Sequence, residues 1–199
     1  VSDTFEPGSP SKILTVAAGL EEGILKGNEY FDCGGYLHVG DWDIKCTAYR
    51  RGGHGSLSLT ESIMQSCNVA MMRIGAMMGR DIFTKYQTIF GMGQKTGVDL
   101  PGEADAAGLV YSADKMGPTE LATNAFGQNY NCTMIQMAAA LCSVINGGSY
   151  YEPHVVRQIL NEQGSVVERK DPVLVRETVS QSTSDFLKEA MFQTVENGT

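Results

Sequence analysis

The sequence predicts an α+β domain in which helices dominate and the β part is a small hairpin. Two capping boxes, Ser58-Leu59-Thr60-Glu61 and Thr133-Met134-Ile135-Gln136, precede apolar runs and therefore predict helix starts. Two short β-prone runs flank Asn161-Glu162-Gln163-Gly164, which is typical of a hairpin turn. With 199 residues, of which 42% are hydrophobic, the chain can bury one sizeable core, so a single domain is expected.

The first helix is expected to begin just after Gly8 and to end near Gly23. Gly8 interrupts the preceding chain, and Pro10 suits the first helical position because its missing N–H would have no partner there. The apolar residues that follow predict one buried face, formed by Ile13, Leu14, Val16, Ala17 and Leu20. Ser9 is therefore expected at a helix N-terminus, where free N–H groups favour negative charge.

Apolar periodicity and stop signals predict the remaining elements. A further helix is expected after each capping box; the first lies before residues 66–68 and the second ends at Gly147. Other helices are expected directly after residues 66–68, over residues 81–90, and from Ser182 or Ser184 onward. Strands are expected over residues 154–159 and 165–169. The segment Ser112-Ala113-Asp114-Lys115 has no apolar helix behind it and is interpreted as a loop.

Ser9 and Lys12 lie three residues apart where the first helix begins, so both are expected on one helix face. A lysine that is partly withdrawn from water has a lowered pKa, and as a neutral amine it can accept a serine proton. The helix end would also stabilise an oxyanion beside Ser9. The pattern indicates an acyl-serine enzyme, although serine is a common helix cap and lysine a common surface residue.

The segment Ser66-Cys67-Asn68 interrupts two helical stretches and is the only SxN sequence in the chain. A polar serine and asparagine held between apolar helices are costly unless they meet partners. One interpretation makes them local helix caps. The other makes them part of the same catalytic site as Ser9 and Lys12.

With both motifs in this order, the chain resembles the transpeptidase domain of class B penicillin-binding proteins, whose SxxK, SxN and KTG boxes form an active site shared with serine β-lactamases. The resemblance covers nearly the whole chain. It extends to Glu6-Pro7-Gly8-Ser9, His54-Gly55, Phe90-Gly91-Met92-Gly93, Thr96-Gly97-Val98-Asp99-Leu100-Pro101-Gly102-Glu103, Phe126-Gly127-Gln128 and Asn146-Gly147-Gly148. The implied fold is the helix-rich part of that transpeptidase fold, as a partial domain over residues 1–199.

The resemblance implies a peptidoglycan D,D-transpeptidase that cross-links cell-wall stem peptides through an acyl-serine and is acylated by β-lactams. Ser9 would be the nucleophile and Lys12 its base. Ser66 would pass a proton to the leaving amine, and Asn68 would hold Lys12 and the substrate amide. This chemistry requires no cofactor.

Two further residues are candidates for substrate binding by the same resemblance. Trp42, the only tryptophan, lies in a loop that can line the cleft near the SxN serine, whereas a lone tryptophan is more often part of the core. Gln128 is expected to face the cleft. Asn129 replaces the glycine expected after Gln128, a departure that bears on the local backbone.

Lys95-Thr96-Gly97 spells the third box but is interpreted as a turn. A functional third box lies on a strand edge, whereas this segment follows Gly91 and Gly93 and leads into Asp99-Leu100-Pro101-Gly102. The KTG strand is therefore expected beyond Thr199. By that expectation the chain is a fragment of a larger domain and is inactive alone.

The cysteines near residue 40 allow three interpretations. Cys33 and Cys46 bracket a loop rich in glycine and aspartate, and His54 follows. A disulfide suits an extracytoplasmic protein, a zinc site would use Cys33, Cys46 and His54, and free buried thiols are the third option. The spacing matches no standard zinc module.

The net charge of −8 offers no basic surface for phosphates, which argues against nucleic-acid binding. No apolar run reaches membrane-spanning length and the start lacks a signal-peptide pattern, so any membrane anchor is expected outside these residues. The resemblance implies the extracytoplasmic face of the bacterial cytoplasmic membrane. The expected partners are stem peptides, β-lactam antibiotics and other cell-wall synthesis proteins.

Two alternative functions share the same boxes. A serine β-lactamase or β-lactam sensor is one, and a β-lactamase needs a carboxylate that activates the deacylating water; Glu103 and Glu120 lie in the general region without a recognisable motif. A non-catalytic structural or interaction domain of the same fold is the other.

Overall fold

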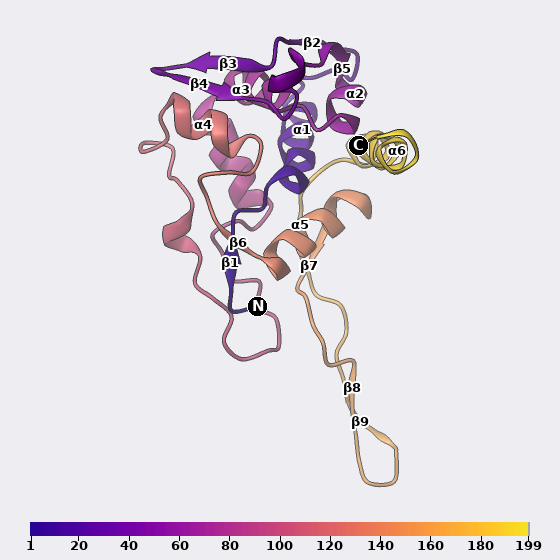
Figure 1. The fold of residues 1–199 in the computed structure, drawn as a ribbon. Coiled ribbons are helices and arrows are strands. Elements are labelled where there is room, and N and C mark those ends of the chain that lie inside the picture. The colour runs from indigo at the N-terminus through magenta and orange to yellow at the C-terminus, as the bar shows by residue number, and fades with distance from the viewer. Residues whose placement is uncertain (199) are drawn as a thin grey trace.

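The computed structural model describes residues 1–198, and its helices pack around the central helix α1 (Figure 1). The helices are α1 (Lys12–Glu21), α2 (Leu59–Met64), α3 (Asn68–Ile89), α4 (Pro118–Asn124), α5 (Met134–Ile145) and α6 (Gln181–Asn197), with short 3-10 turns η1 (Ser9–Ser11), η2 (Tyr49–Arg51) and η3 (Ala107–Leu109). Helix α1 contacts α3, α5 and α6. The predicted α+β class is confirmed.

The strands form five separate antiparallel pairs, β1–β6, β2–β5, β3–β4, β7–β10 and β8–β9. Their bounds are β1 (Thr4–Phe5), β2 (Tyr30–Cys33), β3 (Tyr36–Val39), β4 (Trp42–Lys45), β5 (Gly55–Ser58), β6 (Cys132–Thr133), β7 (Ser149–Tyr151), β8 (Gln158–Leu160), β9 (Val166–Arg169) and β10 (Leu174–Glu177). The predicted hairpin is β8–β9, although its first strand is shorter than expected. The loop expected between Cys33 and Cys46 instead contains the β3–β4 hairpin.

The first helix differs from its prediction at its N-terminus, because Ser9–Ser11 form a 3-10 turn and α1 begins at Lys12. Both the amide and the hydroxyl of Ser11 donate hydrogen bonds to the carbonyl oxygen of Gly8, at 3.1 and 2.8 Å. The hydrogen bond from the amide connects residues three apart, which is the pattern of a 3-10 turn, whereas an α-helix connects residues four apart. Ser9 therefore begins the 3-10 turn rather than the α-helix.

Helix α3 is two helices joined at Gly79. The backbone of Gly79 has φ 73° and ψ 166°, which no α-helix contains. The sequence prediction of one helix after residue 68 and another over residues 81–90 agrees with this break. The first half packs closely on α4, since a Cβ added at Gly75 would lie 3.0 Å from the Cβ of Ala125.

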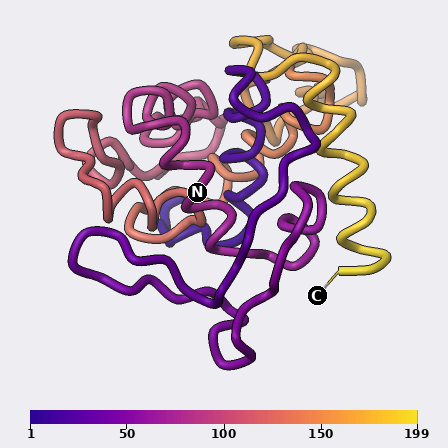
Figure 2. The backbone as a smooth tube through the Cα atoms, turned by 90° about the horizontal axis from the view of Figure 1, so that it is seen from above, coloured from indigo at the N-terminus to yellow at the C-terminus, as the bar shows by residue number. Residues whose placement is uncertain are grey.

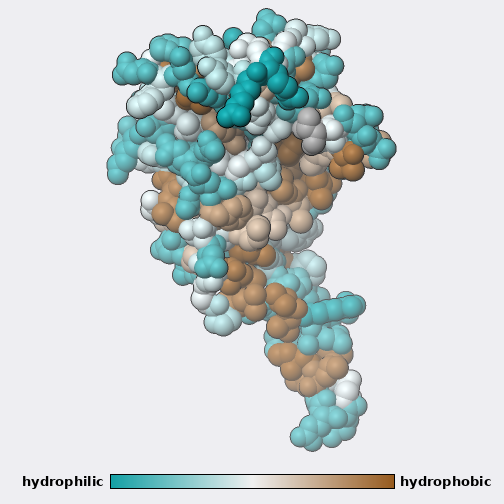
Figure 3. All heavy atoms as spheres, viewed as in Figure 1, coloured by the Kyte–Doolittle hydropathy of each residue, from teal (hydrophilic) through white to brown (hydrophobic). Residues whose placement is uncertain are grey.

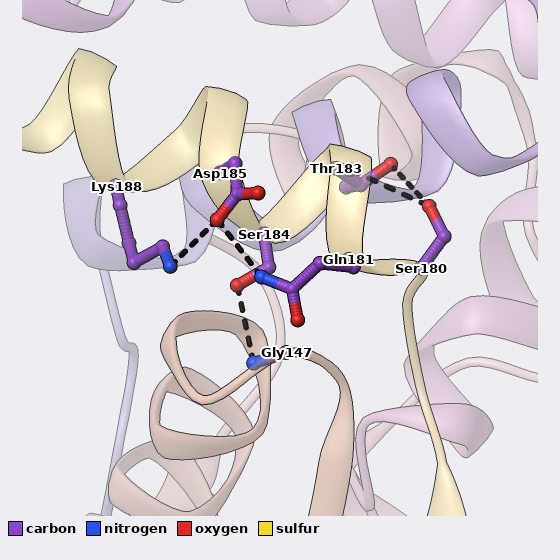
Figure 4. Close-up of polar contacts among 7 residues, drawn as sticks. All are labelled: Gly147, Ser180, Gln181, Thr183, Ser184, Asp185 and Lys188. Atoms are coloured by element: carbon purple, nitrogen blue, oxygen red, sulfur yellow. Dashed lines mark hydrogen bonds and ion pairs between the residues drawn. The ribbon is translucent and has the colours of Figure 1, made fainter.

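Helix α6 runs along one side of the molecule (Figure 2) and packs on α1, α2 and α5. It begins at Gln181 rather than at the predicted Ser182 or Ser184, because the hydroxyl of Ser180 caps it by accepting a hydrogen bond from the amide of Thr183. The hydroxyl of Ser184 accepts a hydrogen bond from the amide of Gly147 at 3.1 Å (Figure 4). That contact fixes α6 against the end of α5.

The core is continuous from α1 to the first half of α3. Val16, Ala17, Met71 and Ile74 are each 0% exposed, and burying a valine, methionine or isoleucine side chain contributes about 1.5 to 3 kcal/mol. Of the helices that the structure describes, none is both long and apolar enough to cross a membrane.

The β8–β9 hairpin extends away from the helical body (Figures 1 and 3). All residues from 154 to 175 are exposed. The carboxylate of Asp99 accepts hydrogen bonds from the amides of Val155 and Val156 at 2.8 and 3.1 Å, which fixes the base of the projection.

Candidate active site

The predicted catalytic residues meet at the N-terminus of α1. The hydroxyl of Ser66 donates a hydrogen bond to Oγ of Ser9 at 2.9 Å, across 57 positions of sequence. Ser9 is exposed, so a substrate can reach its Oγ. Lys12 follows one turn later, as the spacing of the two residues predicted.

Lys12 is 2% exposed, and its ammonium group donates three hydrogen bonds. The acceptors are the carbonyl oxygen of Ser66 at 2.7 Å, Oγ of Ser66 at 2.8 Å and Oδ1 of Asn68 at 2.7 Å. Burial lowers the pKa of Lys12 to about 8, although the thiol groups of Cys46 and Cys67 act in the opposite direction. A substantial fraction of Lys12 is therefore neutral near pH 8, and its link to Ser9 passes through Ser66.

Ser66 lies in the short turn between α2 and α3, in a conformation unusual for a serine. Its φ is 50°, and Ser66 and Asn129 are the two non-glycine residues with positive φ in the described chain. Hydrogen bonds from the Ser66 amide to Ile63 and from the Cys67 amide to Ser62, both 2.9 Å, hold the turn. Strained backbone of this kind persists only where its surroundings fix it, and it concentrates at functional sites.

Asn68 is the first residue of α3, and its side chain is held on both sides. Oδ1 accepts the hydrogen bond from Lys12, and Nδ2 donates one to the carbonyl oxygen of Lys45 at 3.3 Å. Lys45 ends β4, so the β3–β4 hairpin is joined directly to the site. Local capping alone does not describe Ser66 and Asn68, because their side chains meet partners more than 20 residues away.

Gln128 lies beside the loop that precedes Ser9, because Gly127 packs against Gly8. The amide of Gly8 donates a 2.8 Å hydrogen bond to the carbonyl oxygen of Gly127. Gln128 is exposed next to this contact. Asn129 keeps the left-handed backbone that glycine would adopt, with φ 64°, and asparagine tolerates that region better than most residues.

Trp42 lies at the tip of the β3–β4 hairpin, opposite Val39, and is 67% exposed. It is not a core residue. Lys45, which contacts Asn68, ends the same strand three residues later, a separation of about 10 Å.

Two segments that repeat the spelling of a motif, Lys95-Thr96-Gly97 and Ser112-Ala113-Asp114-Lys115, lie outside the site. Lys95 is exposed and Thr96 is buried in an irregular turn, as predicted. The Glu103 carboxylate accepts hydrogen bonds from the amide and hydroxyl of Thr96 at 2.6 and 2.7 Å. Glu103 is thus engaged in fixing this turn. Residues 112–115 likewise form a turn between η3 and α4.

A cluster of three cysteines and one histidine lies directly behind the SxN turn. The ligand atoms of Cys33, Cys46, His54 and Cys67 all lie within 4.8 Å of one another, and we refer to these four residues as the Cys–His cluster. Cys33 pairs with Gly55 in β2–β5, which places His54 beside it. All five cysteines are free thiols in the structure.

Cys46 lies in close contact with two other members of the cluster. Sγ of Cys46 lies 3.9 Å from Sγ of Cys67 and 3.6 Å from Nδ1 of His54. The other ring nitrogen of His54, Nε2, is buried without a hydrogen-bond partner among the described residues. The contact with the Cys67 thiol lowers the pKa of Cys46, and the same contact raises the pKa of Cys67.

Cys67 is the member of the cluster that the sequence does not predict as a ligand. Its side chain also caps α3, where it accepts a hydrogen bond from the amide of Ala70 at 3.4 Å. Its position inside the SxN motif is visible in the sequence. Nothing in the sequence indicates that a turn 21 residues after Cys46 folds back onto that residue.

The fold and the arrangement of Ser9 and Lys12 at the start of a helix are those of proteins with an SxxK box. The family model described as the penicillin binding protein transpeptidase domain matches residues 1–199. The chain belongs to this family.

Named relatives and solved structures agree. The chain is 36% identical to stage V sporulation protein D of Bacillus subtilis over 202 residues, covering 100% of this chain and 30% of that protein. It is 27% identical to the peptidoglycan D,D-transpeptidase MrdA of Acinetobacter baumannii, covering 100% and 31%. The structure of penicillin binding protein 3 from Mycobacterium tuberculosis with aztreonam superposes with a TM-score of 0.83 at 27% identity, covering 98% and 42%. The chain thus spans about a third of the length of the relatives it matches.

Proposed function

We propose that the chain carries the nucleophile of a peptidoglycan D,D-transpeptidase that cross-links cell-wall stem peptides. The observation that carries this proposal is the hydrogen-bonded line from Ser9 through Ser66 to Lys12, with side-chain distances of 2.9 and 2.8 Å. Family membership and the activity named for the A. baumannii relative support it.

In the first step, Oγ of Ser9 attacks the carbonyl carbon of the penultimate D-Ala of a stem peptide. The Ser9 proton passes to Ser66, while Ser66 gives its own proton to the neutral amine of Lys12. The proton returns through Ser66 to the nitrogen of the terminal D-Ala as the C–N bond breaks. The stem peptide remains as an ester on Ser9, and free D-Ala leaves.

In the second step, an amine from a neighbouring stem peptide attacks this ester. The amine loses a proton through the same relay, and Ser9 regains its proton as the new peptide bond forms. Asn68 supports both steps because its Oδ1 orients Lys12, while one N–H of its Nδ2 remains for a substrate carbonyl.

β-Lactams fit the same first step, because their strained ring amide presents a carbonyl to Ser9. Ring opening leaves the departing nitrogen tethered to the acyl group, so the amine of the second step cannot easily enter. The similar M. tuberculosis protein was solved with the β-lactam aztreonam. We propose that Gln128 and Trp42 contact the stem peptide, Gln128 close to Ser9 and Trp42 at a distance from it.

The nucleophile is tested by mass spectrometry of the full-length protein treated with a penicillin. One adduct mass is expected, and peptide mapping should place it on Ser9. Ser9→Ala should abolish the adduct, whereas Ser112→Ala, at the serine of the mimic, should leave it unchanged. An adduct on Ser66, or labelling that persists in Ser9→Ala, would contradict the assignment.

We also propose that the Cys–His cluster binds zinc. This set contains the predicted ligands Cys33, Cys46 and His54 and adds Cys67. Zinc sites with Zn–S bonds of about 2.3 Å and Zn–N bonds of about 2.0 to 2.1 Å are tetrahedral, which requires S–S separations of about 3.8 Å and S–N separations of about 3.6 Å. The distances from Sγ of Cys46 to Sγ of Cys67, 3.9 Å, and to Nδ1 of His54, 3.6 Å, are close to these values.

A further observation supports a metal rather than free thiol groups. Sγ of Cys46 and Sγ of Cys67 accept hydrogen bonds from amides at the start of α3, those of Asn68 and Ala70. Such bonds stabilise thiolates, the form that binds zinc.

Elemental analysis of the full-length protein, purified without chelator, tests the zinc proposal. About one equivalent of zinc is expected, and its removal should lower the Tm because metal binding adds to folding free energy. Cys142, an exposed cysteine on α5, provides the control: Cys142→Ala should retain the metal. A metal-free protein with a mass about two units below the reduced value would indicate a disulfide instead.

The cellular setting follows from the proposed substrate. We propose that the protein acts on the outer face of the bacterial cytoplasmic membrane, where peptidoglycan is cross-linked, and that it works beside other cell-wall synthesis proteins. Labelling of intact cells with a membrane-impermeant fluorescent penicillin tests this location. Labelling only after lysis would contradict it.

A further inference from the structure

A polar pocket begins beside the loop that carries Ser9. Its volume is about 570 Å³, within the range of about 300 to 1,000 Å³ that is typical of ligand pockets. We call it the Asn129 pocket, and its lining includes Glu6, Tyr111, Lys115, Asn129 and Asn131. We propose that the Asn129 pocket binds the acceptor stem peptide, the chain whose amine attacks the Ser9 ester. This inference rests on the transpeptidase function proposed above and deepens it.

The near end of the pocket lies close to Ser9. Glu6 precedes Ser9 by three residues, and three residues span at most about 11 Å. Asn129 follows Gly127 by two residues, and Gly127 is hydrogen-bonded to the loop before Ser9. The SxN turn, by contrast, reaches Ser9 through the hydroxyl of Ser66. The pocket is thus built from segments other than the SxN turn, so it can hold a second peptide while the first is bound at that turn.

Asn129 determines the chemistry of this pocket. It stands where the family resemblance predicts glycine, and it keeps the left-handed backbone with φ 64°. Its amide donates a 2.7 Å hydrogen bond to the carboxylate of Glu6, and its Oδ1 accepts one from the hydroxyl of Tyr111 at 3.3 Å. These bonds fix the side chain and leave the N–H groups of Nδ2 for a peptide carbonyl. Strained backbone of this kind concentrates at functional sites.

The opposite wall of the pocket is also fixed. The amide of Asn131 donates a hydrogen bond to the carbonyl oxygen of Leu109, in η3, at 3.1 Å. Val110 packs against Gly93, where an added Cβ would lie 2.6 Å from the Val110 side chain. A preformed site of this kind binds a peptide without the cost of ordering its own walls.

The charges of the pocket match those of an acceptor peptide. The acidic lining residue, Glu6, is tied to the Ser9 loop, whereas the basic one, Lys115, comes from the 112–115 turn outside the catalytic site. Lys115 is exposed, and the ion pairs of the described residues do not include it. An acceptor stem peptide carries a reactive amine and, elsewhere in the same chain, carboxylates. With its amine directed toward Ser9 past Glu6, it offers a carboxylate to Lys115.

The experiment separates the two chemical steps in the full-length protein. A thioester donor acylates Ser9, and mass spectrometry of the products measures the ratio of transfer to hydrolysis as the acceptor concentration rises. The acceptors are synthetic tripeptides, L-Ala-γ-D-Glu followed by lysine or diaminopimelate, with a free side-chain amine. Each is prepared with free carboxylates and with its carboxylates as primary amides. The wild-type protein should be half-saturated at a lower concentration of the free-carboxylate form.

Asn129→Gly is the central variant, because glycine adopts the backbone of residue 129 without strain. It should raise the half-saturating concentration of both acceptor forms about fivefold, as the loss of one hydrogen bond does. Lys115→Ala should raise it about three- to fivefold for the free-carboxylate form alone, as expected for an exposed ion pair. Lys95→Ala, at an exposed lysine of another turn, provides the control and should match wild type.

Acylation of Ser9 by a fluorescent penicillin is measured on the same variants. If Asn129→Gly slows acylation as much as it weakens transfer, Asn129 acts through the shape of the Ser9 loop and the inference is overturned. Lys115→Ala covers this case independently, because a preference for free carboxylates that persists in that variant would also overturn it.

The remaining failures are distinguishable. Wild-type transfer that is unaltered in Asn129→Gly and Lys115→Ala would overturn the inference while the transpeptidase function stands. An acyl-enzyme that is only hydrolysed with every acceptor would contradict the transpeptidase function and the inference together. If Ser9→Ala is still labelled, the proposed catalytic assignment is wrong, whatever the acceptor results.

Discussion

The amide of Gly8 and the carbonyl oxygen of Gly127 are joined by a 2.8 Å hydrogen bond, which sets the loop before Ser9 directly against the 126–129 turn. Gly127 has φ 89°, and a Cβ there would lie 2.0 Å from the Gly8 carbonyl oxygen and 2.4 Å from Oγ of Ser11. The fit between these two segments therefore excludes any side chain at residue 127.

Gly127→Ala should destabilise the protein and slow acylation by displacing the Ser9 loop. Left-handed backbone costs alanine about 1 to 2 kcal/mol, and overlap in a packed site adds about 1 to 3 kcal/mol. Gly102→Ala is the matched control, because Gly102 has φ 82° but open space around its Cβ position. Denaturant unfolding and penicillin labelling should show a smaller stability loss and no rate loss for the control. Equal effects of both changes would mean that the overlap at Gly8 is unimportant.

The rate of acylation should depend on pH through Lys12. Burial lowers the pKa of this residue to about 8, and the base must be neutral to accept the proton relayed by Ser66. The rate constant should therefore rise with pH, fall about tenfold per unit well below pH 8, and level off above the pKa. Stopped-flow labelling between pH 6 and 9.5 measures this profile. A rate independent of pH across that range would exclude Lys12 as the base.

Lys95→Ala should leave the acylation rate nearly unchanged, because Lys95 is an exposed residue of an irregular turn. Lys12→Ala should lower the rate by about 10²-fold or more, as the loss of a general base does. Both variants can be compared by the same fluorescent-penicillin assay. A large loss in Lys95→Ala would place the Lys95-Thr96-Gly97 segment in the active site after all.

Glu103→Ala separates a transpeptidase from a β-lactamase. The Glu103 carboxylate holds Thr96 and Gly97 through hydrogen bonds of 2.6 to 3.2 Å, and bonds to a charged group contribute about 1.5 to 3 kcal/mol each. The change should lower stability but leave the lifetime of the penicilloyl-enzyme unchanged. A markedly longer lifetime in the variant would indicate that Glu103 activates a deacylating water.

Residues with local signals were placed well by sequence reasoning. Ser9 and Lys12 are linked by helical spacing, and the capping boxes at Ser58 and Thr133 both form. The break at Gly79 follows from separate apolar patterns on its two sides. In each case, residues within one or two turns determine the structure.

Long-range pairings could not be predicted in the same way. The β2–β5 pair joins residues 30–33 to 55–58 with strands of four residues, too short for alternation of apolar and polar side chains to stand out. That pair brings Cys33 to His54, and the turn at Ser66 then adds Cys67. The Cys–His cluster thus forms only through tertiary folding. Cys33, Cys46 and His54 are close enough in sequence to suggest a common site, whereas Cys67 is not.

The projecting β8–β9 hairpin is expected to differ from the helical body in hydrogen exchange and in its susceptibility to proteases. Because every residue from 154 to 175 is exposed, its amides should exchange with deuterium long before those of α1, which are released only by global unfolding. The tip at Asn161–Gly164 is accordingly the first place a protease would cut. Ser9, Lys12, Ser66 and Asn68 all precede that cut, so a nicked chain would keep these four residues on one piece.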